Sequence, residues 1–88
     1  YMQLKKQNDF TVYNTTGAKI STITIYTTNA SQLTNLKAAA ADLTFTANDA
    51  EFSITIEVDS TGDFTFTNVG TSTAYISGVE IVYIPAAE

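Results

Sequence analysis

The stretch Glu51–Val58 alternates strictly between polar and apolar residues. Side chains of an extended strand point alternately to opposite faces, so this segment predicts a strand with one buried face and one solvated face. The buried face would carry Phe52, Ile54, Ile56 and Val58, and the solvated face Glu51, Ser53, Thr55 and Glu57.

Similar patterns recur at Leu43–Ala47 and Asp63–Asn68, and Thr73–Ile84 is rich in β-branched and aromatic residues. Together they predict a mainly β fold, a small antiparallel β-sandwich of the jelly-roll or immunoglobulin-like type. The 88 residues suffice for one domain, residues 1–88, with one core. Because Tyr1 precedes Met2, we expect a processed product or a part of a longer protein.

A long β-branched strand is predicted over Lys19–Thr28, with Ile23 and Ile25 on one face. Ile20 falls on the opposite parity. Either a β-bulge shifts the register there or Ile20 packs at the edge of the sheet.

One short helix is predicted near residues 31–41, because alanines cluster there and Leu33, Leu36 and Ala40 are spaced three and four apart. Ser31 is the expected N-cap. An ordered loop is the alternative, since isolated helices of this length are marginal unless they pack.

The run Asp59-Ser60-Thr61-Gly62 predicts a hairpin turn with positive φ at Gly62, across which Asp63–Asn68 would pair back. In the last segment, the parity shift at Ser77-Gly78 predicts a β-bulge that keeps Val79, Ile81 and Tyr83 facing inward. We expect Tyr1–Lys6 and Val79–Ile84 to be edge strands, whose backbone could accept a strand from another chain.

Composition excludes several kinds of chemistry. The chain lacks His, Cys, Trp and Arg, so it cannot build a Ser-His-Asp triad, a Cys-His nucleophile or the usual zinc and copper sites. A net charge of −5 opposes binding to nucleic acids and anionic membranes, and no apolar run is long enough to span a bilayer. We therefore expect a protein that is not an enzyme and has no cofactor.

Calcium is the one metal worth considering. Asp59, Thr61 and Asp63 surround a tight turn and offer the hard oxygen ligands that Ca²⁺ prefers. An ordinary Asp-Gly hairpin explains the same residues and is the favoured interpretation.

A glycan site is a further hypothesis, because exposed aromatic faces stack on sugar rings and neighbouring amides bind their hydroxyls. The candidate ligand-binding residues are Tyr13, Tyr26, Tyr75, Asn14 and Asn29. The alternative is that these tyrosines are half-buried packing residues.

Two pieces, FTVYNTTGAKISTITI (residues 10–25) and DFTFTNVGTSTAYISGVEIVY (residues 63–83), carry a family resemblance. They resemble the later strands of jelly-roll-like β-sandwich modules appended to secreted and surface proteins of Bacteroidetes-type bacteria and their phages. The resemblance covers less than half of the chain and rests on core positions. It implies a non-catalytic accessory, adhesive or structural module.

The sequence therefore predicts a structural or adhesive module of an extracellular, cell-surface or virion assembly. Threonine supplies 16 of the 88 residues and would coat the solvated strand faces with hydroxyls. The expected partner is another protein or a further copy of this chain. The alternative is a carbohydrate-binding accessory module of a secreted enzyme.

Overall fold

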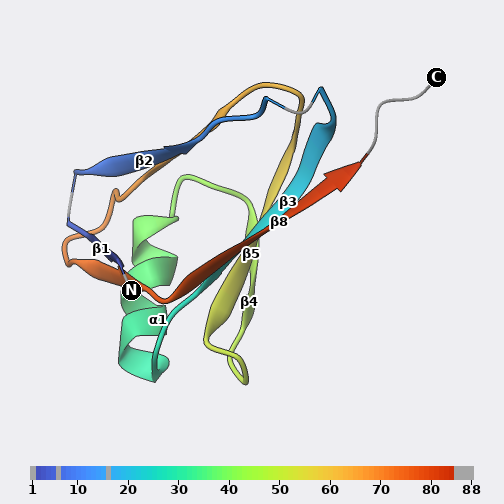
Figure 1. Cartoon of the computed structure of the whole chain (residues 1–88). Helices are drawn as coiled ribbons and strands as arrows, with labels where there is room; N and C mark the ends of the chain where they lie inside the picture. The colour runs from blue at the N-terminus through green and yellow to red at the C-terminus, as the bar shows by residue number, and fades with distance from the viewer. Residues whose placement is uncertain (1, 6, 16, 85–88) are drawn as a thin grey trace.

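The computed structural model describes residues 2–5, 7–15 and 17–84. It confirms a mainly antiparallel β-structure with one short helix (Figure 1). The elements are β1 (Met2–Leu4), β2 (Asp9–Val12), β3 (Lys19–Tyr26), α1 (Ala30–Ala39), β4 (Phe45–Asn48), β5 (Ser53–Ser60), β6 (Phe64–Thr67), β7 (Ala74–Ile76) and β8 (Gly78–Ile84). The jelly-roll or immunoglobulin-like topology stays a prediction.

The largest sheet has the strand order β4-β5-β3-β8. Its inner face carries a row of isoleucines from the two central strands, which pair Ile23 with Ile56 and Ile25 with Ile54. All four are fully buried, as their alternation predicts. This row forms the centre of the core because β-branched side chains pack closely on a pleated surface.

A two-stranded ribbon lies on the same side of this sheet as α1 (Figure 1). One end of the ribbon pairs β2 with β6, and the other pairs β1 with β7. The rings of Phe10 and Phe66, which are direct cross-strand partners, stack with centroids 5.4 Å apart. Phe66, Leu4 and Ile76 carry the ribbon's side of the core.

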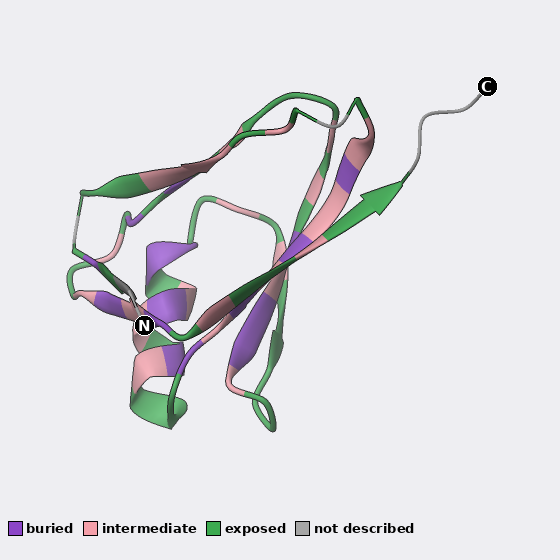
Figure 2. Cartoon of the chain, in the orientation of Figure 1, coloured by how far each residue is buried: buried purple, intermediate pink, exposed green. Residues whose placement is uncertain are grey.

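The helix α1 buries Leu33 and Leu36, as the sequence predicts, together with Ala39 (Figure 2). Ala40, the third predicted residue, is buried as the C-cap that follows the helix. Its N-cap is Asn29 and not Ser31, because Asn29 Oδ1 accepts the Gln32 N–H at 2.9 Å. Both residue types cap helices well, so composition could not separate the two positions.

Of the two alternatives considered for Ile20, the structure confirms the β-bulge. The register of β3 shifts between Ile20 and Thr22 against both of its neighbours, β5 and β8. On the β5 side the extra residue falls between Glu57 and Ser60, where Asp59 has a φ of 52°. The shift returns Ile20 to the inner face, where it is fully buried.

The predicted hairpin between β5 and β6 is wrong. β5 already has β3 on one side and β4 on the other, so β6 pairs with β2 instead. The left-handed residue of this region is Asp59, in the bulge of β5, and Gly62 in the connecting loop has no positive φ. The Ser60 hydroxyl accepts the Gly62 N–H at 3.1 Å and closes the turn.

The β-bulge predicted at Ser77-Gly78 is wrong, because the chain crosses from one sheet to another at these residues. β7 ends at Ile76 and pairs with β1, whereas β8 starts at Gly78 and pairs with β3. The Ser77 N–H donates to the Tyr26 carbonyl oxygen at 2.8 Å at this corner. Local parity shows that the register breaks, but it does not distinguish a bulge from a crossing between sheets.

The solvated face of the large sheet is coated with hydroxyls, and the Thr24 and Thr55 side chains share a hydrogen bond of 3.0 Å there. Ser53 departs from the predicted pattern and is buried. Its cross-strand neighbours on this face, Tyr26 and Asn48, flank the small side chain from both sides.

Candidate functional site

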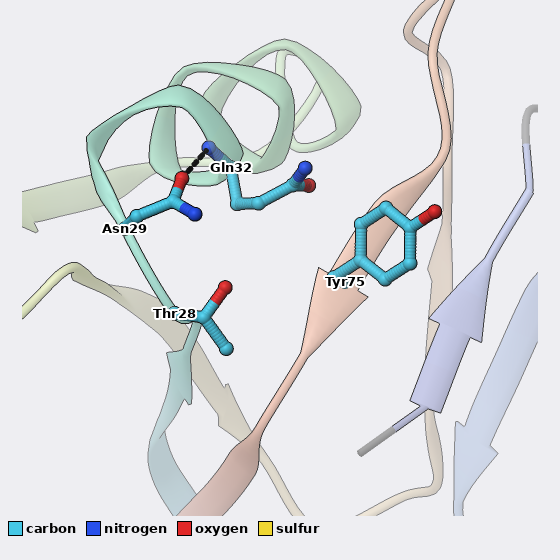
Figure 3. Close-up of a pocket in the computed structure, with 4 residues that line it drawn as sticks. All are labelled: Thr28, Asn29, Gln32 and Tyr75. Atoms are coloured by element: carbon cyan, nitrogen blue, oxygen red, sulfur yellow. Dashed lines mark hydrogen bonds between the residues drawn. The ribbon is translucent and has the colours of Figure 1, made fainter.

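A pocket of about 300 Å³ opens where α1 begins, and Tyr75 closes its other side (Figure 3). Thr28 and Asn29 lie in the chain just before the helix, and Gln32 follows in its first turn. The four lining residues supply one phenol ring, two amides and one aliphatic hydroxyl, and none of them is an aspartate, glutamate, lysine or arginine.

Two hydrogen bonds fix the geometry of this pocket. Asn29 Oδ1 is engaged in capping the helix, which leaves the amide nitrogen of the same side chain on the pocket side (Figure 3). The Thr27 hydroxyl donates to the Tyr75 carbonyl oxygen at 2.6 Å and holds β7 beside the end of β3.

Gln32 reaches from the helix toward the Tyr75 ring (Figure 3). Its Oε1 is buried and has no hydrogen-bond partner among the described residues. Buried polar atoms in folded proteins are nearly always paired, so an unpaired acceptor at a pocket wall needs an explanation.

The structure brings together two of the five predicted ligand-binding residues, Tyr75 and Asn29. Tyr26 lies on the solvated face of the large sheet, and Tyr13 is 73% exposed on the loop after β2. Gln32 and Thr28 were not predicted, because nothing in a helical pattern marks which polar residue will face a distant strand.

Asn14 joins the predicted calcium loop instead of lining a pocket. Its backbone N–H donates to Asp63 Oδ1 at 2.7 Å, and its Nδ2 donates to the carbonyl oxygens of Ala18 and Thr61. Asn14 thus ties the loop before β3 to the loop after β5.

The three predicted calcium ligands are engaged with protein groups. Asp59 forms a 2.8 Å ion pair with Lys19. Asp63 accepts through its carboxylate and Thr61 through its backbone carbonyl oxygen, in both cases from Asn14. Across the described part of the chain, no three acidic side chains gather as a metal would require. These residues thus bond to other groups of the fold, and calcium binding at this loop stays a prediction.

Tyr26 has an altered acidity. The negative charge of Glu80, which is the cross-strand neighbour of Thr24, raises the pKa of the Tyr26 phenol above its ordinary 10.0. Partial burial of the ring and the charge of Glu51 act in the same direction. The phenol is therefore protonated throughout the neutral range.

A second candidate surface is β8. Against the prediction, Val79 and Tyr83 are not buried, although both lie on the inner face of the sheet. On the other face Val82 and Ile84 are exposed as well. Exposed fractions are 43% for Val79, 44% for Val82, 37% for Tyr83 and 48% for Ile84.

β8 is also an edge strand, as predicted. Among the described strands its one neighbour is β3, so its other side presents unpaired backbone groups. The prediction for Tyr1–Lys6 is met by β1, which pairs with β7 alone; Tyr1 and Lys6 themselves lie outside the described residues.

No protein-family model matches this chain, and searches of curated proteins and solved structures return no similar protein. The resemblance to Bacteroidetes-type modules therefore stays a prediction. In the described part of the chain, no helix has the length and apolar character needed to cross a membrane.

Proposed function

We propose that this chain is a non-enzymatic structural module that assembles through the free edge of β8. The observation that carries the proposal is the apolar character of both faces of this strand. Soluble proteins protect their edge strands with charges, prolines or a covering segment, and a long apolar edge pairs readily with another strand.

The opposite edge of the sheet has a different character. β4 has four residues, and Thr46, Ala47 and Asn48 on it are exposed. Asp49 and Glu51 follow in its turn. β8 has seven residues and one charge, Glu80. β8 is thus the longer and more apolar of the two edges of this sheet, and a second copy that pairs along it meets a single charge per strand.

The occupant we propose is β8 of a second copy, added antiparallel with Ile81 opposite the partner's Ile81. This register pairs all residues from Gly78 to Ile84 and sets Val79 opposite the partner's Tyr83. It also sets Glu80 opposite the partner's Val82, so the two glutamates do not face each other. Cross-strand apolar pairs stabilise a sheet, while like charges directly opposite destabilise it.

The hydroxyl-rich solvated face supports placing this module on an extracellular, cell-surface or virion assembly, and the lack of His and Cys supports a non-enzymatic role. Joining two copies through β8 would extend each four-stranded sheet into one continuous sheet. Such an extension is a common way to build interactions from backbone hydrogen bonds alone.

Sedimentation equilibrium of two substitutions at one position tests this register. Val82→Glu places a glutamate opposite the partner's Glu80 at two symmetric positions, and should weaken dimerisation about fivefold or more. Val82→Lys places a lysine there, and should preserve the dimer or strengthen it. Thr46→Glu, an exposed position on β4, is the control and should leave the dimer unchanged.

A chain that remains monomeric at high concentration would refute the proposal. Equal effects of glutamate and lysine at position 82 would refute the register, and a loss of dimer in the Thr46→Glu variant would move the interface to β4.

A further inference from the structure

We infer that the pocket formed by Thr28, Asn29, Gln32 and Tyr75 binds an uncharged, hydroxyl-rich ligand, the end of a saccharide chain. The pocket volume of about 300 Å³ lies at the lower end of the range for small-molecule sites, which suits a ligand of monosaccharide size. This inference is independent of assembly through β8.

The lining determines the charge of the ligand. None of the lining residues Thr28, Asn29, Gln32 and Tyr75 is an aspartate, glutamate, lysine or arginine, so the pocket offers no counter-ion to a phosphate, a carboxylate or an ammonium group. The net charge of −5 further disfavours anions. A neutral ligand is the class that remains.

The hydrogen-bonding groups determine that the ligand must donate as well as accept. Gln32 Oε1 is an acceptor, buried and without a partner among the described residues, so it needs a donor such as a sugar hydroxyl. Asn29 Oδ1 accepts the hydrogen bond of the helix cap, so the amide nitrogen of Asn29, which is a donor, faces the pocket. Adjacent sugar hydroxyls can satisfy both groups at once.

The Tyr75 ring supplies the apolar part of the site. Aromatic faces pack against the C–H face of a sugar, while amides bind its hydroxyls. Figure 3 shows the ring across the pocket from Gln32, so a ligand between them would contact both. This ring and Asn29 are the two predicted glycan-binding residues that the fold brings together.

The test is an NMR titration of the isotope-labelled full chain with glucose, galactose and N-acetylglucosamine, one at a time. At least one sugar should shift the side-chain amide signals of Gln32 and Asn29 in a saturable manner, with a Kd on the order of 1 mM or lower. If none of these sugars moves these signals, the inference is wrong.

Matched variants separate a binding role from a structural one. Gln32→Met keeps the length of the side chain and removes the acceptor, so it should abolish the shift of Asn29. Gln32→Glu keeps an acceptor and should retain measurable binding, while Thr34→Ala, an exposed change on the same helix, should bind as the wild type does.

Thermal melting of each variant confirms that it is folded. Binding that persists unchanged in a folded Gln32→Met variant would overturn the inference. If that variant does not fold, Tyr75→Leu serves as the second variant and should weaken binding at least tenfold; unchanged binding there would equally refute the site.

Discussion

Asn68 shows how one buried amide can organise two pieces of sheet. It sits at the break between the two ends of the ribbon, and its Nδ2 donates to the carbonyl oxygens of Leu4 and Ser72, each at 2.9 Å. Its Oδ1 accepts the Gly70 N–H at 2.9 Å. The amide nitrogen and the amide oxygen of this buried side chain thus both have hydrogen-bond partners inside the protein.

Replacing Asn68 with alanine would remove the partner of the buried Leu4 carbonyl oxygen and of two part-buried groups, the Ser72 carbonyl oxygen and the Gly70 N–H. Each such group costs about 1–3 kcal/mol, so we expect Asn68→Ala to lower the free energy of unfolding by about 3 kcal/mol. Urea denaturation measures the change. Thr67→Ala, at the exposed neighbouring position, should stay within about 0.5 kcal/mol of wild type. A loss below about 1 kcal/mol for Asn68→Ala would show that the amide is not the organising group.

The raised pKa of Tyr26 predicts a pH dependence at the alkaline end. The phenol of the unfolded chain ionises near 10.0, before that of the folded chain, so the free energy of unfolding should fall as the pH rises above that value. Glu80→Gln removes the main cause and should bring the pKa of Tyr26 back toward 10.0.

Tyrosinate absorbance against pH, with Tyr26→Phe identifying the Tyr26 contribution, measures this effect. The titration is run at a concentration that keeps the chain monomeric. An unchanged Tyr26 transition in Glu80→Gln would contradict the electrostatic explanation.

At the scale of elements, the stability of two variants at the start of α1 tests whether Asn29 or Ser31 caps the helix. Asn29→Ala should destabilise the protein by about 1 kcal/mol, because the Gln32 N–H loses its acceptor. Ser31→Ala should change stability by less than about 0.5 kcal/mol, since that side chain is exposed within the helix. Thermal unfolding of both variants compares them directly, and a larger loss for Ser31→Ala would place the cap where the sequence alone suggested.

Alanine substitutions at Gly70 and Gly62 give a second pair of variants whose stabilities can be compared. A Cβ on Gly70 would lie 3.2 Å from backbone atoms of Ala38 and Ala39, where the loop after β6 passes the end of α1. Gly70→Ala should therefore destabilise by about 1–2 kcal/mol. Gly62→Ala meets only the Ser60 hydroxyl at 3.6 Å and should be tolerated. Chemical denaturation would contradict the structure if Gly62→Ala were the more damaging change.

The sequence predicts elements better than it predicts their partners. Alternation correctly placed Ile54 and Ile56 in the core, and the odd parity of Ile20 revealed a bulge. The pairing of β6 could not be predicted, because a turn-like loop does not show that both sides of β5 are taken. Strand pairing over long sequence separations is set by the whole fold, so local patterns carry little information about it.

The same limit applies at the scale of the molecule. The tyrosines and asparagines in the sequence suggested a glycan site, but only Tyr75 and Asn29 meet, because β7 crosses to the start of α1. Gln32, whose buried acceptor defines the pocket, was not predicted. The edge position of β8 was predicted, whereas the exposure of Val79 and Tyr83 was not, since a core-like composition does not show which side of a strand remains uncovered.

The fold as a whole covers one face of a four-stranded sheet with α1 and a two-stranded ribbon and leaves the long, apolar edge of β8 open. Our central claim is that a second copy closes this edge.

Hydrogen–deuterium exchange at increasing protein concentration tests that claim most directly. Backbone amides of Gly78–Ile84 should exchange more slowly as the concentration rises, those of β4 should not change, and Val82→Glu should remove the effect. Exchange in β8 that is the same at every concentration would contradict the account.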